Sequence, residues 1–432
     1  MAYGVYIHTP FCASKCPYCD FYSGVFDPAR MAPLVDAILR EAALRWSALP
    51  IAPVSSLYVG GGTPSLLPPP LLERLLGGLR ETLPLDGDAE ITVEANPESL
   101  DPATAETLLT AGVGRLSVGL QALDDTLLAC LGRAHDAARA LEAARLARRC
   151  FRAVSFDLLL GVPGLDLTTL EHTLQALLAL EPDHLSVYDL TDEPGTPFTA
   201  ARARGELPVV PDAACLAQDA LVERLLGAAG FERYEVSNYA RPGGACRHNL
   251  AIWRGGWYLG LGPAAHSKLP LGESPYGLRQ ANVRDLDAYL AAVAGGGDAV
   301  ASREVIDRRQ AIEERLLLGL RLAEGIDLDR VARDCGLADA AALLDPAVVA
   351  SLGAGGFIER RGSWLRVTPR GRQVLDEIVT RLAVAIALPA AAPAVAPAPA
   401  PEPGPAADAP TPTPAPGPAA EDHHEASGWR AR

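Results

Sequence analysis

Residues 3–24 of the chain read YGVYIHTPFCASKCPYCDFYSG and combine a short apolar run with three closely spaced cysteines. The run at 3–8 is typical of a buried β-strand, and Cys12, Cys16 and Cys19 follow it with the spacing C-x3-C-x2-C. No fourth cysteine lies nearby, whereas a structural zinc ion takes four protein ligands and a disulfide takes two thiols. The stretch therefore predicts a strand that leads into a loop carrying three thiols.

Strand-like runs and helix-like stretches alternate from residue 3 to residue 189. Asp101, Asp124 and Thr168 are expected to cap helices. This alternation predicts an α/β fold with a parallel sheet and external helices. Six strand–helix units favour a partial, TIM-like (β/α)6 barrel, and a doubly wound sheet is the alternative. The further apolar runs lie at 55–60, 90–95, 114–119, 153–160 and 183–189, and helical spacing occurs at 30–47, 69–83, 101–111, 136–149 and 167–180.

The alternation fades from about residue 200, and composition divides the chain into four segments. Residues 1–230 form the α/β core, and residues 231–300, rich in Tyr, Trp, Asn and Gly, form an extension. Residues 301–385 predict an α+β module that resembles a winged helix, with a helix from 304, a hairpin near 356–368 and a helix at 370–384. Residues 386–432 form an Ala/Pro-rich tail that cannot bury a core and is expected to be disordered.

The 432-residue chain is 49% hydrophobic and carries a formal charge of −15. This acidic balance argues against broad binding to nucleic acids or anionic membranes, which use basic surfaces. The eight cysteines are too sparse for a secreted disulfide framework, so a reducing cytoplasm is favoured. The start shows no signal-peptide pattern, and no apolar run reaches about 20 residues, so no membrane span is expected.

Three thiolates with no fourth ligand suit an iron–sulfur cube. A 4Fe–4S cluster held by three cysteines leaves one iron open to another ligand. Zinc is the alternative, and it would need a distant fourth ligand such as His8. The aromatic residues Phe11, Tyr18 and Phe21 lie around the loop and are expected to shield the cluster.

Residues 58–65, YVGGGTPS, end the second strand with three consecutive glycines. Glycine lets the backbone approach a ligand closely and adopt positive φ. The stretch lacks the lysine of a Walker loop and the G-x-G-x-x-G pattern of dinucleotide sites. Since functional residues of such folds collect at the carboxyl ends of strands, we expect Cys12, the glycine turn and Glu94 to lie together.

Several motifs, in order, resemble the radical S-adenosylmethionine (SAM) superfamily. The three-cysteine loop and GGGTPS carry the general resemblance, and ITVEANPESL, RLSVGLQALDDTLLACLGRAH, FDLLLGVP and HLSVYDLTDEPGTPF are similar to the oxygen-independent coproporphyrinogen III oxidase group. Within that group, RYEVSNYARPG and HNLAIW resemble the HemW-type haem chaperones. The resemblance spans about residues 3–384. It implies a radical SAM core over residues 1–230 and three cofactors: a 4Fe–4S cluster, SAM and haem.

The resemblance also implies which side chains bind the cofactors. Cys12, Cys16 and Cys19 would ligate the 4Fe–4S cluster, whose open iron would bind SAM. Gln121, Arg133 and Asp157 match residues that contact a second SAM molecule in the oxidases, and their presence is compatible with such a site here. The SAM site itself would be formed by Tyr6, Tyr18, Gly61, Gly62, Thr63 and Glu94.

Two features favour a chaperone over an oxidase. The oxidases resemble C-x3-C-x2-C-x-C, whereas this chain has Phe21 at the position of the fourth cysteine. They also carry an added N-terminal segment before the cluster strand, which is not expected here. The chaperone pattern H-N-x-x-Y-W is matched by HNLAIW except at Ile252, where tyrosine is expected. Haem needs an axial ligand and an apolar pocket, and His248 is the first candidate ligand, with His266 as the second.

The main hypothesis is a cytoplasmic haem chaperone that delivers haem to apo-haemoprotein acceptors. Candidate partners are a reductant such as flavodoxin or ferredoxin and, transiently, membrane proteins. The alternative is a radical SAM enzyme that acts on a tetrapyrrole, as a coproporphyrinogen III oxidase or a haem-degrading methyltransferase relative. A third hypothesis treats the winged-helix-like module as a nucleic-acid reader, although Glu359 and the acidic chain count against it. Its basis is a group of arginines: Arg360, Arg361, Arg366, Arg370 and Arg372.

Overall fold

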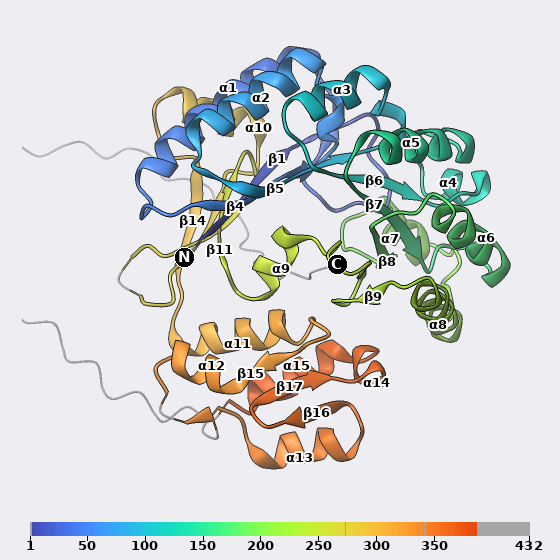
Figure 1. Ribbon diagram of the computed structural model, residues 1–432, viewed down its shortest axis with the longest axis vertical. Helices are drawn as coiled ribbons and strands as arrows, with labels where there is room; N and C mark the ends of the chain where they lie inside the picture. The colour runs from blue at the N-terminus through green and yellow to red at the C-terminus, as the bar shows by residue number, and fades with distance from the viewer. Residues whose placement is uncertain (1, 273, 338, 341–342, 387–432) are drawn as a thin grey trace, which may run out of the picture. The chain divides into compact units, whose positions relative to one another are not determined.

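The computed structural model describes residues 2–272, 274–337, 339–340 and 343–386 (Figure 1). The predicted Ala/Pro tail therefore lies outside the described residues from position 387 onward. Within the described residues, one large sheet has the strand order β14-β13-β12-β11-β1-β4-β5-β6-β7-β8-β10-β9. None of the described helices is long and apolar enough to cross a lipid bilayer.

The predicted apolar runs form consecutive strands of this sheet. Each strand pairs in parallel with the next one in the chain. A doubly wound sheet would reverse its strand order part-way, so that alternative is wrong and the partial barrel is confirmed. The strands are β1 (Tyr3–Thr9), β4 (Val54–Gly61), β5 (Leu85–Ala95), β6 (Arg115–Gln121), β7 (Ala153–Leu160) and β8 (His184–Asp189).

Helices between these strands cover the outer face of the sheet (Figure 1). Asp101 and Asp124 cap α3 and α4 as predicted. The cap of α6 is Asp166 rather than Thr168, because the Asp166 carboxylate accepts a hydrogen bond from the Thr169 N–H. The apolar faces of the helices pack on the strands in one continuous core. The helices are α1 (Pro28–Ser47), α2 (Pro69–Thr82), α3 (Pro102–Thr110), α4 (Asp125–Cys130), α5 (Ala137–Cys150) and α6 (Leu167–Leu178).

The residues where the alternation fades continue the sheet at both edges. β11 pairs in parallel with β1, while β12, β13 and β14 add antiparallel strands beyond it. At the other edge β10 pairs antiparallel with β8. These elements are α7 (Pro197–Ala203), α8 (Asp212–Ala228), β9 (Glu232–Arg233), β10 (Asn238–Ala240), α9 (Arg247–Trp253), β11 (Trp257–Leu261), β12 (His266–Leu269), β13 (Leu278–Asn282), α10 (Leu286–Ala294) and β14 (Val300–Val305). A separate pair, β2 (Phe11–Cys12) and β3 (Gly24–Val25), flanks the cysteine loop.

The C-terminal module has the expected helices and hairpin. A small sheet with the order β15-β17-β16 contains the hairpin, whose turn includes Gly362. The helix predicted from residue 304 begins at Arg308, and the one predicted at 370–384 is interrupted between α14 and α15. The module contains α11 (Arg308–Gly319), β15 (Ile326–Asp327), α12 (Leu328–Asp334), α13 (Pro346–Ala354), β16 (Ile358–Arg361), β17 (Trp364–Val367), α14 (Pro369–Arg372) and α15 (Leu375–Val384).

Carboxylates pair with several of the arginines that suggested nucleic-acid binding. Arg366 and Arg361 both lie near Glu359, at 2.7 and 3.6 Å, and Arg372 pairs with Glu223 at 2.9 Å. Each pair reduces the positive charge that a phosphate backbone would attract. The geometry therefore weakens the basis of the nucleic-acid hypothesis.

Candidate cofactor site

The three cysteines lie on the loop that follows β1, at the carboxyl end of the parallel strands. Lys15 Nζ closes this loop by donating hydrogen bonds to the carbonyl oxygens of Phe21 and Ser23, each at 3.0 Å. Pairing of β2 with β3 holds the two ends of the loop together. The loop thus presents three free thiols of intermediate exposure: Cys12, Cys16 and Cys19.

Aromatic side chains pack on one side of the cysteine loop. Tyr18 is buried in an apolar cluster against which Cys16 and Cys19 pack. Phe11 is also buried, at 3% exposure, and belongs to the main core. Phe21, in contrast, is 55% exposed.

The described residues contain no group of three His, Cys, Asp or Glu side chains close enough to hold a single metal ion. The thiolates of a 4Fe–4S cube bind separate iron corners and need not converge on one point. His8, the fourth ligand in the zinc alternative, has both ring nitrogens engaged. Its Nε2 lies 2.8 Å from the Tyr22 carbonyl oxygen, and its Nδ1 lies 3.0 Å from the Tyr6 hydroxyl. The donor set therefore fits an iron–sulfur cube better than a closed zinc site.

The glycine turn after β4 has no room for side chains. A Cβ atom on Gly60 would lie 2.6 Å from the Glu94 carboxylate, and one on Gly62 would lie 2.5 Å from the Phe11 carbonyl oxygen. Gly61 has a φ of +102°, a conformation that residues with a Cβ rarely adopt. The turn is glycine-rich because β5 and the cysteine loop pack directly against its backbone.

Glu94 places a carboxylate inside the barrel beside this turn. It accepts hydrogen bonds from the Tyr58 hydroxyl at 2.8 Å and from the Gly61 N–H at 3.1 Å. Burial raises the pKa of Glu94 to about 7, and these two hydrogen bonds oppose the rise. The ring of Tyr6 lies 6.3 Å from the ring of Tyr58. A carboxylate in this position can accept hydrogen bonds from an ammonium group or from ribose hydroxyls.

Arg133 connects the cysteine loop to the end of β5. Its Nη1 donates to Cys16 Sγ at 3.4 Å, and its Nη2 donates to Asn96 Oδ1 at 2.6 Å. Asn96 Nδ2 donates in turn to Thr63 Oγ1 at 2.8 Å. The guanidinium thus lies beside the sulfur of one predicted cluster ligand. The hydrogen-bond chain thus brings Thr63, Arg133 and one cysteine together through Asn96.

Gln121 and Asp157 lie on the neighbouring strands β6 and β7. Gln121 ends β6 at a φ of +68°, and a Cβ atom on Gly119 would lie 3.0 Å from its Nε2 and 3.7 Å from Arg133 Nη2. Asp157 accepts hydrogen bonds from Ser117 Oγ at 3.1 and 3.3 Å. Burial raises the pKa of Asp157. The structure therefore places Gln121 close to Arg133, whereas Asp157 lies among the hydroxyl groups inside the barrel.

His248 lies inside the barrel near the amino ends of the strands, away from the cysteine loop. Its Nδ1 is 2.9 Å from Ser56 Oγ, and its ring centroid is 5.2 Å from that of Tyr58. Its Nε2 is buried and has no hydrogen-bond partner among the described residues, and the side chain is only 3% exposed. Haem cannot reach Nε2 in this arrangement.

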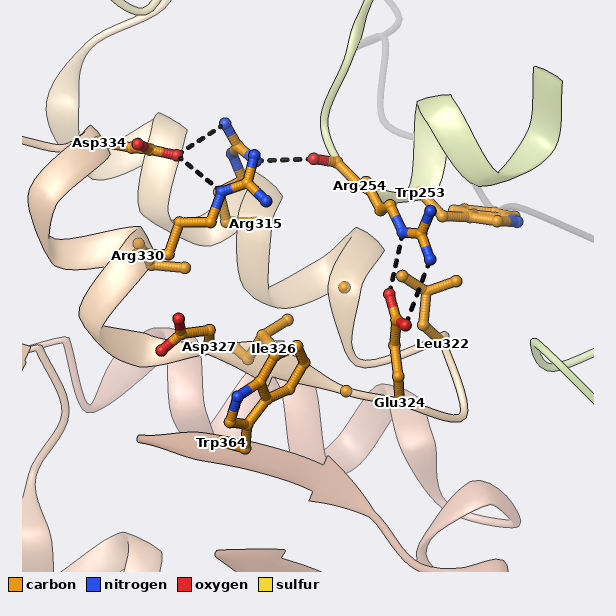
Figure 2. A pocket seen from close by; sticks show the side chains of 13 residues that line it. Trp253, Arg254, Arg315, Leu322, Glu324, Ile326, Asp327, Arg330, Asp334 and Trp364 are labelled. Atoms are coloured by element: carbon orange, nitrogen blue, oxygen red, sulfur yellow. Dashed lines mark hydrogen bonds and ion pairs between the residues drawn. The ribbon is translucent and has the colours of Figure 1, made fainter. Parts of the chain in front are cut away.

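Both ends of α9, the helix that carries His248, are anchored. The backbone N–H groups at its start donate to the Glu90 carboxylate at 3.1 Å. Just beyond its end, Arg254 pairs with Glu324 at 2.9 and 3.2 Å, and Arg315 donates to the Arg254 carbonyl oxygen at 2.7 Å (Figure 2). The contacts of Arg254 with Glu324 and Arg315 border a cleft of about 150 Å³ between α9 and the C-terminal module. The anchors fix the depth of His248 in the barrel.

The comparisons with known proteins agree with this geometry. Residues 6–177 match the radical SAM superfamily, and residues 306–374 match the HemN C-terminal domain. The heme chaperone HemW of Mycobacterium tuberculosis H37Rv is 37% identical over 88% of this chain and 94% of its own length. The chain belongs to the HemW family. Its membership in the radical SAM superfamily means that its cofactors include a 4Fe–4S cluster and SAM.

Further relatives and one solved structure are consistent with this family assignment. Escherichia coli HemW is 40% identical over 61% of this chain and 70% of its own length. A mitochondrial radical SAM domain-containing protein 1 from Bos taurus is 37% identical over 74% of each chain. The solved structure of the coproporphyrinogen III oxidase HemN from E. coli covers 88% of this chain and 90% of its own, with a TM-score of 0.75 and 24% identity. That likeness supports the fold alone.

Several interior residues of the barrel were not predicted from the sequence. Asn96, Tyr58, Ser117 and Ser56 all contact predicted site residues. The available signal was a period-2 pattern of polar residues within apolar strands, as at Ser56 and Tyr58 or at Ser155 and Asp157. In a strand buried on both faces, such a pattern marks the side that faces the barrel interior.

Proposed function

We propose that this protein is a haem chaperone, which binds haem together with a 4Fe–4S cluster and SAM and delivers the haem to acceptor proteins. The observation that carries the proposal is the similarity to HemW of M. tuberculosis, a heme chaperone, over nearly the whole length of both chains. The position of Phe21 also supports it, because the fourth cysteine of the oxidase pattern is replaced by an exposed apolar side chain.

In this proposal the carboxyl end of the barrel holds the cluster and SAM. Cys12, Cys16 and Cys19 bind three irons, and the fourth iron is left for SAM. Glu94 and the backbone of Gly61 and Gly62 bind the amino-acid or ribose groups of SAM. Tyr6, Tyr18 and Thr63 line the same space, while Gln121, Arg133 and Asp157 form the candidate region for a second SAM molecule.

We further propose that the protein works in the cytoplasm, on the basis of its sparse, unpaired cysteines. Apo-haemoproteins would accept the haem, and some acceptors would be membrane proteins reached by transient contact. A flavodoxin or ferredoxin would supply electrons to the cluster. The acidic charge of the chain and the paired arginines of the C-terminal module argue against nucleic acid as a partner.

A haem-transfer assay tests this function. The full chain, with its cluster reconstituted without oxygen, is loaded with haem and mixed with an apo-haemoprotein, and the Soret band of the acceptor is followed. We expect transfer from the loaded protein at a rate that differs from that of free haem. Replacing Cys16 by serine should remove the cluster, and Cys150→Ser, on an outer helix, is the matched control.

The same preparation separates the chaperone from an enzyme. It is incubated with dithionite, SAM and coproporphyrinogen III, and the products are separated by chromatography. Protoporphyrinogen formed together with two molecules of 5′-deoxyadenosine, one for each propionate that is decarboxylated, would favour the oxidase alternative. Absence of haem binding by the wild-type protein would overturn the chaperone proposal.

A further inference from the structure

Haem binding, as proposed above, requires a histidine or similar donor that the iron can reach. Most histidines of the described chain fail this requirement. Each of them is less than 9% exposed, so haem iron cannot reach its ring nitrogens. They are His8, His135, His184 and His248. The family motif HNLAIW therefore does not offer an accessible donor in this structure.

Two histidines within the described ranges are exposed, His172 and His266. His172 lies on α6, one of the helices on the outer face of the barrel. His266 begins β12, directly after the turn that joins β11 to β12 at the carboxyl end of the barrel. That turn packs on β1, since a Cβ atom on Gly262 would lie 2.4 Å from the His8 carbonyl oxygen. His266 is thus the exposed histidine on the side of the molecule where the cysteine loop lies.

An exposed cation lies close to His266. Arg284 follows β13, the strand that pairs with β12. Burial and the charge of Arg284 lower the pKa of His266, so its imidazole is neutral near pH 7. The Arg284 guanidinium lies 5.6 Å from the ring centroid of Tyr22 and makes no ion pair with any described carboxylate. A propionate group could therefore pair with it without displacing a carboxylate.

The cysteine loop brings apolar surface to the same place. Tyr22, near the end of this loop, accepts a hydrogen bond from the Leu286 N–H through its hydroxyl at 2.8 Å, which ties the loop to the segment carrying Arg284. Around Tyr22 the loop exposes three large apolar side chains, which is unusual for residues of this kind. They are Phe21 at 55%, Val25 at 65% and Phe26 at 42% exposure.

The cleft shown in Figure 2 is not a suitable haem site. Its volume of about 150 Å³ is below the roughly 300–1,000 Å³ that is usual for ligand pockets. Its charged lining is also already paired, as at Arg254 with Glu324 and Arg315 with Asp334.

We propose that haem binds at the rim of the barrel beside the cysteine loop, with His266 as its axial ligand and Arg284 as the partner of a propionate. The exposed apolar side chains of the loop contact the porphyrin. This assignment rests on the proposed haem-binding function, and it moves the haem from the buried HNLAIW helix to the end of the barrel that holds the cluster. Haem and cluster then share one loop, so occupancy of one site can influence the other.

Anaerobic titration of the cluster-reconstituted full chain with hemin tests this assignment. The readouts are the Soret band, the electron paramagnetic resonance spectrum of the ferric haem and the dissociation constant. His266→Ala should change both spectra and weaken binding by at least about tenfold. Arg284→Met should weaken binding several-fold without changing the ligand-dependent spectra, because it removes a cation but not a donor.

Three controls keep the result interpretable. His172→Ala is the matched exposed histidine and should bind hemin like the wild type, as should a variant in which both His423 and His424 are replaced by alanine. Circular dichroism and the measured iron and sulfide content are used to check that His266→Ala is folded and holds its cluster. Unchanged spectra and affinity in this variant would overturn the assignment and leave the chaperone proposal intact. A wild-type protein that binds no hemin would instead overturn both.

Discussion

The raised pKa of Glu94, a residue of the proposed SAM site, can be tested quantitatively in the protein without cofactors. Burial raises the pKa of its carboxyl group to about 7, compared with an ordinary value of 4.5. The folded state therefore holds this proton more tightly than the unfolded chain does. It follows that the free energy of unfolding falls as the pH rises through the interval from 4.5 to about 7, and Glu94→Gln removes this loss.

At about 1.4 kcal/mol for each pKa unit, the full difference amounts to about 3 kcal/mol, of which about 2 kcal/mol develops between pH 5.5 and pH 8. Glutamine cannot ionise, and its side-chain oxygen can still accept a hydrogen bond from Tyr58. Urea unfolding followed by circular dichroism at both pH values should thus show that wild type loses about 2 kcal/mol more than Glu94→Gln. Glu106→Gln, at an exposed position on α3, is the matched control.

If the free energy of unfolding depends on pH equally in wild type and Glu94→Gln, burial does not raise the pKa of this carboxyl group, and the argument is refuted. The same variant should also bind SAM about 10- to 100-fold more weakly in anaerobic equilibrium dialysis, because a charge-assisted hydrogen bond is lost. If SAM affinity stays unchanged, Glu94 is not a SAM ligand, whatever its pKa.

Three further changes test the packing around the site. Gly62→Ala should lower the iron and sulfide content after reconstitution, because its Cβ would lie 2.5 Å from a backbone carbonyl oxygen; Gly24→Ala, with nothing within 4 Å, should not. Arg45→Met should reduce the free energy of unfolding by about 3–5 kcal/mol in urea, because it leaves the buried Glu41 carboxylate without its cation; a loss below about 1 kcal/mol would contradict this. His248→Ala should lower the thermal midpoint yet leave the Soret spectrum of bound hemin unchanged, and a shifted Soret band would show that α9 opens to bind haem.

Sequence patterns predict the central strands well because a buried parallel strand reads as a short continuous apolar run. They fail at β11, although its sequence WYLGL is apolar, because the run lies among glycines and aromatic residues that mask the alternation. Its pairing is also remote in sequence, with Trp257 beside Tyr3. Local composition carries no information about a partner at such a distance.

The candidate site also contains some residues that could be placed from the sequence and others that could not. Cys12, Gly61 and Glu94 could be placed together from the sequence, because the carboxyl ends of parallel strands meet at one edge of the sheet. The partners of Glu94 and Arg133 could not, since Tyr58 of β4 and Asn96, directly after β5, each lie more than 30 positions away from the residue that they contact. Side-chain exposure was also beyond the sequence, as shown by the exposed Phe21 and the buried His248.

The HNLAIW motif has a structural explanation that does not require haem. Its histidine contacts Ser56 of β4, and the start of α9 binds the Glu90 carboxylate of β5. Just beyond the motif, Arg254 binds Glu324 of the C-terminal module. Substituting any of these residues would weaken the attachment of α9 to the barrel or to the module, which gives the motif a structural role. Because packing alone accounts for His248, its presence in the sequence is not evidence that it binds haem, and an exposed donor such as His266 fits that chemistry better.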